Sequence, residues 1–303
     1  MLVLFLAHLV RQIRVEFMLA TVRAESSETA LATLRRVETA DRNESCRAGG
    51  EPELTSEGAT RGEAGANHVL APRSGFLTGL DEQALLRAAV AHDMVIALDA
   101  YPGCFLVEGT PIGRYWPGGH ADVDADDLTG RIRNAVRTGP ERTEAQDIGY
   151  GLRQLTDVAV KALSPGINDP TTAVHAMNHV GVLLCQLATL DLTPLVMRDD
   201  RHRMRVVLDR PDFGSLLDLA FTQPRRYGAA DPVVLGHLLR LLADLAWHCR
   251  DEQKAQVTIQ LERLIATTTA QDFHPTESAR LQDLATDVRS ALAGSWASRA
   301  VQA

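Results

Sequence analysis

A short polar segment between two predicted helices carries the residues best suited to chemistry in this chain. Lys161 and Ser164 stand three residues apart, and Asn168 and Asp169 follow before the second helix. A serine activated by a desolvated lysine can act as a nucleophile, and the free amides of a helix start can bind an anion. The same residue types also end and start helices, because Ser and Asp side chains hydrogen-bond to nearby backbone. The segment is therefore either a site or a structural corner.

The helix that precedes this segment, from about residue 144 to residue 163, positions several of its polar side chains. Apolar residues recur on one face at spacings of three and four, which predicts that this face is buried. Another face carries Arg153, Asp157 and Lys161 at successive i,i+4 steps, so that Asp157 can pair with both neighbours. The candidate functional motif comprises six residues: Arg153, Asp157, Lys161, Ser164, Asn168 and Asp169.

The corner itself is well supplied with helix punctuation. Pro165 disfavours helix at Ser164, and Gly166 permits a positive φ for the reversal. Asp169 fits the N-cap of the second helix, with Pro170 at the first helical position. The carboxylate of Asp169 would then occupy the place where an external anion would bind, which favours a structural corner over a site.

Other catalytic and metal-binding patterns are weak or missing. His175 and His179 lie four residues apart on the second helix, but Ala176 stands where the HExxH motif needs Glu. The chain also lacks the GxSxG motif, the phosphate-binding GxxxxGK[ST] motif and a GxGxxG that opens a helix. We therefore expect no metal site and no cofactor. The cysteines Cys185 and Cys249 stand among apolar residues and are expected to act as small buried hydrophobes.

The charge of the chain argues against nucleic acid as a partner. The net charge is -8, from 31 basic and 39 acidic residues, whereas phosphate binding needs a basic surface. The basic run from Arg198 to Arg205 contains acidic residues as well, and we interpret it as a solvated face.

The N-terminal sequence points toward a membrane. Met1 to Val10 reads MLVLFLAHLV, about ten apolar residues, whereas a membrane span needs roughly twenty. Arg11 and Arg14 follow at once. This pattern is typical of the last half of a transmembrane helix with basic residues at its cytosolic exit. The alternative is an amphipathic helix that packs on the protein or on a bilayer surface.

Composition and periodicity divide the chain into four parts. These are a membrane-proximal helix (1–38), a flexible linker (39–67), a small β-rich unit (68–120) and a mainly helical domain with the polar segment (121–303). One further strand is predicted at Met204–Asp209. The β-rich unit resembles a biotinyl/lipoyl hammerhead barrel, but it contains no lysine that could carry such a cofactor. The expected fold class is α+β, with a hammerhead- or barrel-like unit followed by a mainly α-helical domain.

Several segments resemble a bacterial family of predicted membrane proteins, domain of unknown function 2254. The resemblance is carried by DIGYGLRQLTDVAVKALSPGINDPTTAVHAM (Asp147 to Met177), and by the segments around Ala71–Phe76, Pro102–Gly113 and Phe5–Glu25. It implies that most of the candidate motif, together with Pro165, Gly166 and Pro170, belongs to the family signature. It also implies several N-terminal transmembrane helices, so we expect this chain to be a truncated, mis-started or naturally shorter form.

The leading hypothesis is a non-enzymatic, membrane-associated module in assembly, regulation or transport. Its partner would be a membrane or a membrane protein, self-association is an open alternative, and its soluble domains would be cytoplasmic. One alternative is a hydrolase-type enzyme in which five residues converge in a pocket: Asp157, Lys161, Ser164, Asn168 and Asp169. Another is a domain that senses an anion or ligand at the start of the second helix.

Overall fold

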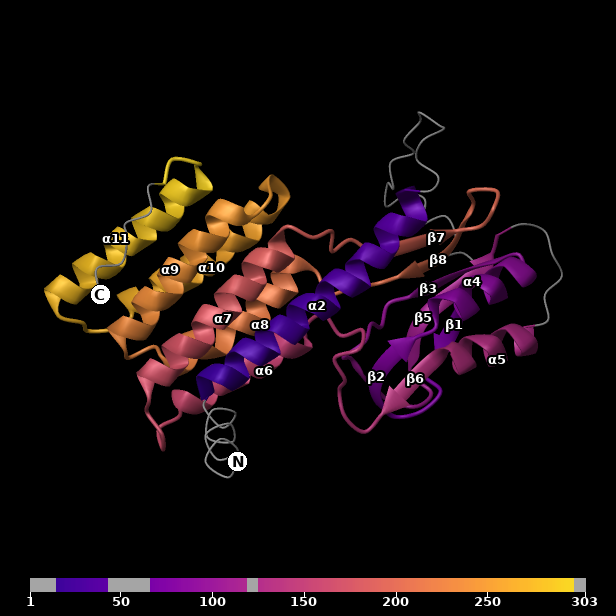
Figure 1. Ribbon diagram of the computed structural model, residues 1–303, viewed down its shortest axis with the longest axis horizontal. Coiled ribbons are helices and arrows are strands. Elements are labelled where there is room, and N and C mark those ends of the chain that lie inside the picture. The colour runs from indigo at the N-terminus through magenta and orange to yellow at the C-terminus, as the bar shows by residue number, and fades with distance from the viewer. Residues whose placement is uncertain (1–14, 43–65, 119–124, 297–303) are drawn as a thin grey trace, which may run out of the picture. The chain divides into compact units, whose positions relative to one another are not determined.

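A computed structural model describes residues 15–42, 66–118 and 125–296 of the chain (Figure 1). Contacts between residues divide the chain into two compact units. Unit 1 comprises Met1–Glu28, Gly151–Asp191 and Asp212–Ala303, and unit 2 comprises Thr29–Tyr150 and Leu192–Pro211. Where it is described, unit 1 is helical, whereas unit 2 combines helices with two sheets, so the α+β class is confirmed.

Unit 2 contains two sheets and two helices of its own among its described residues. Its elements are β1 (Asn67–Leu70), β2 (Gly75–Leu80), α4 (Glu82–Ala91), β3 (Met94–Leu98), β4 (Phe105–Leu106), β5 (Pro111–Pro117), α5 (Ala125–Ala135), β6 (Val136–Gly139), β7 (Leu195–Arg198) and β8 (Met204–Leu208). The larger sheet has the order β1-β5-β3-β8-β7, and the smaller has the order β4-β2-β6. Asp81 caps α4 by accepting a hydrogen bond from the Ala84 amide at 2.9 Å.

The division into units does not follow the expected boundary at residue 121. The elements α5 and β6 follow that residue, and β7 and β8 come much later, yet all four belong to unit 2. The strand predicted at Met204–Asp209 is confirmed as β8. It pairs in parallel with β3, with Ile96 opposite Val206. Parallel neighbours require a long crossover, and here the crossover runs through unit 1.

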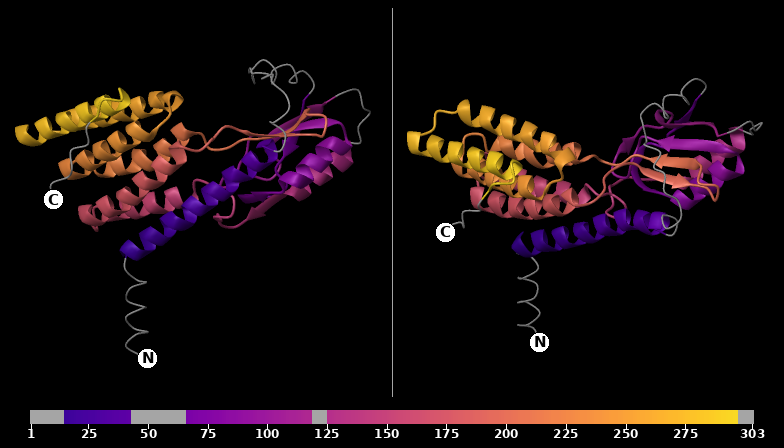
Figure 2. Two further views of the ribbon diagram at one scale, coloured as in Figure 1. Left: turned by 45° about the horizontal axis from the view of Figure 1, so that its top comes forward. Right: turned by 90° about the horizontal axis from the view of Figure 1, so that it is seen from above.

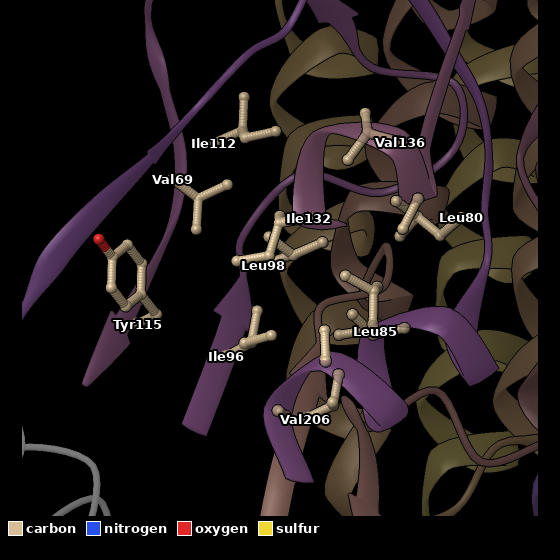
Figure 3. Packing of buried hydrophobic residues seen from close by; sticks show 14 of the residues in the cluster. Val69, Leu80, Leu85, Ile96, Leu98, Ile112, Tyr115, Ile132, Val136 and Val206 are labelled. Carbon is tan, nitrogen blue, oxygen red and sulfur yellow. The ribbon is translucent and has the colours of Figure 1, made fainter. Parts of the chain in front are cut away.

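The core of unit 2 lies between the larger sheet and the helices α4 and α5 (Figure 3). Leu85 of α4 and Ile132 of α5 meet Ile96 of β3 and Val206 of β8 in one apolar cluster. All four side chains are at most 1% exposed. Burial of each such side chain stabilises the fold by about 1.5–3 kcal/mol, so this cluster holds two distant parts of the sequence together.

A buried arginine links the β7–β8 hairpin to the start of β3. Arg205 is 1% exposed, and its Nη2 donates to Asp93 Oδ1 at 2.6 Å while its Nε donates to Asp199 Oδ2 at 2.8 Å. Burial raises the pKa of Asp199, but hydrogen bonds from Arg205 and from the hairpin amides outweigh it and hold that pKa well below its usual range. The expectation of a solvated face from Arg198 to Arg205 is therefore wrong for Arg205 and Asp199.

Unit 1 is a set of packed helices. Its described elements are the first part of α2 (Val15–Arg42), then α6 (Tyr150–Ala162), α7 (Pro170–Ala188), α8 (Phe213–Tyr227), α9 (Pro232–His248), the 3-10 turn η1 (Asp251–Gln253), α10 (Lys254–Thr269) and α11 (Pro275–Leu292). The helix α9 packs against α7, α10 and α11, and its side chains are buried on most faces. Asp231 caps it by accepting from the Val233 amide at 2.8 Å, as the Asp-Pro pair predicts. Gly294, with φ of +71°, follows the end of α11 as expected.

The helix α2 begins in unit 1 and continues into unit 2. It approaches α6 so closely that a Cβ atom at Gly151 would collide with the Ser26 side chain. The lack of a side chain at Gly151 therefore permits the close packing of α2 against α6. The helix ends at Arg42, so the first residues of the segment expected to be a linker, 39–42, are helical.

Two expectations fall outside the described residues. These are the membrane-proximal sequence from residue 1 to residue 14 and most of the expected linker, residues 43–65. Within the described part of the chain, none of the helices has the length and apolar character needed to span a bilayer.

Candidate functional site

The polar segment forms a compact turn between α6 and α7, here named the α6–α7 corner and defined as Leu163–Asp169. Its backbone amides are used within the turn. The amides of Ile167 and Asn168 donate to the Ser164 carbonyl at 3.0 and 2.8 Å, and the Asp169 amide donates to the Ala162 carbonyl at 2.8 Å. Because these donors already have partners, the corner offers few amides to a ligand.

The reversal at the corner depends on Asn168, contrary to the expectation for Gly166. Asn168 has a φ of +47°, in the left-handed region, whereas Gly166 is not among the residues with positive φ. Asn tolerates this conformation better than most residues, because its short polar side chain can hydrogen-bond locally. This residue of the candidate motif therefore has a conformational role.

Ser164 and Lys161 do not form a nucleophile and its base in this structure. The Ser164 hydroxyl donates to the backbone carbonyl of Lys161 at 2.7 Å, and the Lys161 side chain is exposed. A serine nucleophile needs its proton accepted by a nearby base, and here the Ser164 hydroxyl donates to a backbone carbonyl instead. The geometry therefore gives no support to the hydrolase hypothesis.

Asp169 acts as the N-cap of α7. Its Oδ1 accepts from the Thr172 amide at 3.0 Å and its Oδ2 accepts from the Thr172 hydroxyl at 2.5 Å. These two hydrogen bonds, the side-chain one first, lower the pKa of Asp169 from its usual value. A carboxylate of the chain itself thus occupies the anion position at this helix start, as its sequence position suggests.

The remaining members of the candidate motif do not converge on the corner. No ion pair joins Arg153, Asp157 and Lys161 within the described structure, so the expected ladder is not formed. Asp157 and Lys161 are exposed, while Arg153 is half-buried and its Nε has no hydrogen-bond partner among the described residues. His175 and His179 of α7 are not part of any group of metal-binding side chains among the described residues.

The first turns of α2 lie at the same end of unit 1 as the corner. Ser27 of α2 donates to Gln186 Oε1 of α7 at 2.5 Å, and the charge of Arg23 contributes to the lowered pKa of His179, after burial. The order of these contacts shows that α2 and α7 run in the same direction, as Figure 1 also shows. The start of α2 therefore lies beside the start of α7 and the corner.

A groove between α7 and α9 is a second candidate. It encloses about 520 Å³ and is lined by Asn178, Gly181, Val182, Cys185, Gln186, Thr189, Leu241, Asp244 and His248. Burial raises the pKa of Cys185 to about 12, so the thiol is not a reactive nucleophile at neutral pH. Burial also raises the pKa of Asp244, although this residue is exposed by its accessible surface. Asp244 and His248 are not among the candidates that the sequence suggests, although their i,i+4 spacing on an apolar helix was an available signal.

A smaller cavity of about 30 Å³ lies in unit 2, where the parallel strands β3 and β8 end. Its lining includes Tyr101, Gln146, Asp209 and Arg210. Such a volume holds about two water molecules, which is too small for an organic substrate.

Comparison with known proteins identifies relatives but no activity. A family model described as "Predicted membrane protein (DUF2254)" matches residues 1–244. The uncharacterised proteins Mb1321c of Mycobacterium bovis and Rv1290c of Mycobacterium tuberculosis are each 32% identical to this chain over 289 residues. The alignment covers 95% of this chain and 53% of each relative, so the chain spans about half the length of the curated relatives it matches. No solved structure matches the chain.

Proposed function

The chain belongs to the DUF2254 family of predicted membrane proteins, and from this premise we propose that it is a non-enzymatic, membrane-associated module in assembly, regulation or transport. The observation that carries the proposal is the start of α2. Phe17 and Met18 are 46% and 51% exposed there. In the sequence they follow the apolar run from Met1 to Val10 and the basic residues Arg11 and Arg14.

Apolar side chains beside basic residues suit a membrane surface. Exposed Phe and Met side chains gain free energy when they leave water for the headgroup and acyl boundary of a bilayer. Arg11 and Arg14 add attraction to anionic lipids, at about 1 kcal/mol for each basic residue near the surface. Membrane association with the soluble units on the cytoplasmic side is therefore the arrangement we propose.

The attachment of α2 to unit 1 would transmit such an anchor to the rest of the unit. Gly151 lets α2 approach α6, and the bond from Ser27 to Gln186 joins α2 to α7. Membrane contact at Phe17 and Met18 would thus position a packed group of helices. Its partner would be the bilayer or a membrane protein within it.

The corner geometry supports the non-enzymatic part of the proposal. The Ser164 hydroxyl is bound to a backbone carbonyl, and the Asp169 carboxylate fills the helix start where an anion would bind. Both alternatives from the sequence, a hydrolase and an anion sensor, relied on these groups being available.

Vesicle co-sedimentation of the full chain tests the proposal. With vesicles of phosphatidylcholine and phosphatidylglycerol we expect the chain to pellet. The double variant Phe17→Ser, Met18→Ser should bind roughly thirtyfold less tightly, because two half-exposed apolar side chains contribute about 2 kcal/mol together. Ile259→Ser, which removes a similarly exposed side chain from α10, is the matched control and should bind as the parent does. A chain that neither pellets with vesicles nor self-associates in sedimentation velocity would refute the proposal.

A further inference from the structure

Exposed apolar side chains of unit 1 gather at one end of its helices. The large hydrophobic residues with substantial exposure in unit 1 are Phe17, Met18, Ile167, Val182, Tyr227, Val233, Trp247 and Ile259. Single exposed apolar residues scattered over a surface are normal, whereas several that share one surface indicate an interaction site. The directions of the helices decide this.

The helix α9 runs in the same direction as α7. The charge of His175 contributes to the lowered pKa of His237, and a Cβ atom at Gly181 would touch Leu241. Both contacts join residues at similar distances from the starts of the two helices, so the start of α9 lies beside the start of α7. Val233 is in the first turn of α9 and therefore lies at the end of unit 1 that contains the α6–α7 corner. Figures 1 and 2 show that α9 begins at this end.

The helix α8 ends at the same end of unit 1 at which α9 begins. It ends at Tyr227, five residues before α9 begins at Pro232, so the end of α8 is close to the start of α9. Five of the eight exposed residues thus lie at one end of unit 1, which we call the corner end: Phe17, Met18, Ile167, Tyr227 and Val233. They come from four separate segments of the chain, and only tertiary structure brings them together.

We propose that the corner end is the face with which unit 1 contacts the lipid bilayer, and that Ile167 inserts there beside Phe17 and Met18. Ile167 is 62% exposed and Val233 is 63% exposed, at the tip of the corner and at a helix start. This inference rests on the proposed membrane association, and it names the surface that would serve it.

Two further observations favour lipid as the occupant of this surface. In the sequence the apolar run from Met1 to Val10 precedes α2, and α2 begins at this end of unit 1. The helix starts at this end are also capped from within the chain, by Asp169 on α7 and Asp231 on α9. A surface whose backbone amides are already bonded can enter the headgroup region without leaving polar groups unsatisfied.

The α6–α7 corner then has a clear role in the proposal. Its internal hydrogen bonds and the left-handed Asn168 fix a rigid tip, and the tip presents Ile167 to the bilayer. Exposed Lys161, at the end of α6, stands where a basic side chain can reach lipid phosphates.

Site-specific fluorescence with the full chain tests this surface. In a background with the native cysteines replaced by serine, an environment-sensitive dye is attached to Ile167→Cys, Val233→Cys or the control Ile259→Cys. With phosphatidylcholine and phosphatidylglycerol vesicles we expect blue-shifted emission, about twofold or more brighter, at positions 167 and 233 and little change at 259. The variant Ile167→Asp should lower the vesicle partition coefficient about tenfold, while its circular dichroism matches the parent.

The outcomes separate this inference from the proposed function. If the chain pellets with vesicles but the dyes at 167 and 233 stay in water and Ile167→Asp binds normally, the surface assignment is overturned and membrane association stands. If the dyes respond to protein concentration without vesicles, the corner end is an interface between copies and the assignment is again overturned. If no vesicle binding occurs, the surface assignment is overturned, and the proposed function fails with it when the chain also does not self-associate in sedimentation velocity.

Discussion

Acidification should destabilise unit 1 through one buried histidine, His237 of α9. The side chain is 9% exposed, and its Nε2 has no hydrogen-bond partner among the described residues. Burial, followed by the nearby charges of Arg240 and His175, lowers the pKa of His237 to about 4. The folded state therefore holds this imidazole neutral at pH values where the unfolded chain binds a proton.

The size and direction of this change in stability follow from the pKa of His237 in the folded and in the unfolded state. Because the folded pKa lies below the ordinary value of 6.5, the unfolded state is favoured as pH falls from about 6.5, and the effect is complete below about 4. A gap of this size corresponds to about 3 kcal/mol at 1.36 kcal/mol per pH unit. The free energy of unfolding of a typical domain is about 5–15 kcal/mol, so an effect of this size is a large part of it.

Urea unfolding between pH 7 and pH 4, followed by tryptophan fluorescence and circular dichroism, measures this effect. Other groups also titrate in this range, so the useful quantity is the difference between the parent and His237→Leu. We expect the variant to gain about 3 kcal/mol relative to the parent over that pH interval. His248→Gln, an exposed position on the same helix, is the matched control. Parallel pH profiles for the parent and His237→Leu would refute the burial argument.

Four further predictions test other parts of the structure. Gly151→Ala should separate α2 from α6 and lower the free energy of unfolding by about 1–3 kcal/mol, measured by thermal unfolding. Gly130→Ala, where a Cβ atom meets nothing within 4 Å, is the control and should raise the free energy of unfolding by about 0.5–1 kcal/mol. Equal effects of the two substitutions would contradict the close contact at Gly151. Arg205→Leu should cost up to about 3–5 kcal/mol in urea unfolding, because Asp93 and Asp199 lose the buried guanidinium between them and keep only the exposed Arg203 as a cation. A cost below about 1 kcal/mol would show that Arg203 alone satisfies both carboxylates. Asn168→Ala should cost about 1–2 kcal/mol and Asn168→Gly much less, since only the former strains the left-handed backbone; the reverse order would disprove that reading. In a variant that keeps Cys185 as its single cysteine, Cys185 should react with iodoacetamide at pH 8 roughly 10³-fold more slowly than a thiol of ordinary pKa, because burial raises its pKa to about 12. Rapid labelling would show that the thiol is not buried.

Much of the local structure could be predicted from the sequence. The strands β2, β3 and β8, the capped starts of α4, α7 and α9, and the stop at Gly294 all follow from short-range rules. These rules succeed because caps, prolines and alternating apolar residues act within a few positions of one another. The identification of the reversal residue failed at the corner, since Gly166 and Asn168 both satisfy the local rule and only the assembled turn selects one.

The candidate site was predicted in part. The sequence correctly marked the segment from Ser164 to Asp169 as a constrained turn between two helices, and it correctly assigned Asp169 as a cap. It could not decide whether Arg153, Asp157 and Lys161 pair, because exposed ion pairs are worth only about 0–1 kcal/mol and compete with water. Whether the segment functions as a site stays a prediction.

The sequence by itself determined several helix and strand ends, the capped start of α7 at the α6–α7 corner and the family to which the chain belongs. Only the tertiary structure decided which distant segments meet. It joined β3 to β8 across unit 1, buried Arg205 between Asp93 and Asp199, and brought Ile167 to the same end of the helices as Phe17. The physical reason is that hydrogen bonds of caps and turns act over a few residues, whereas burial of apolar surface rewards any segments that pack together, however far apart they lie in the chain.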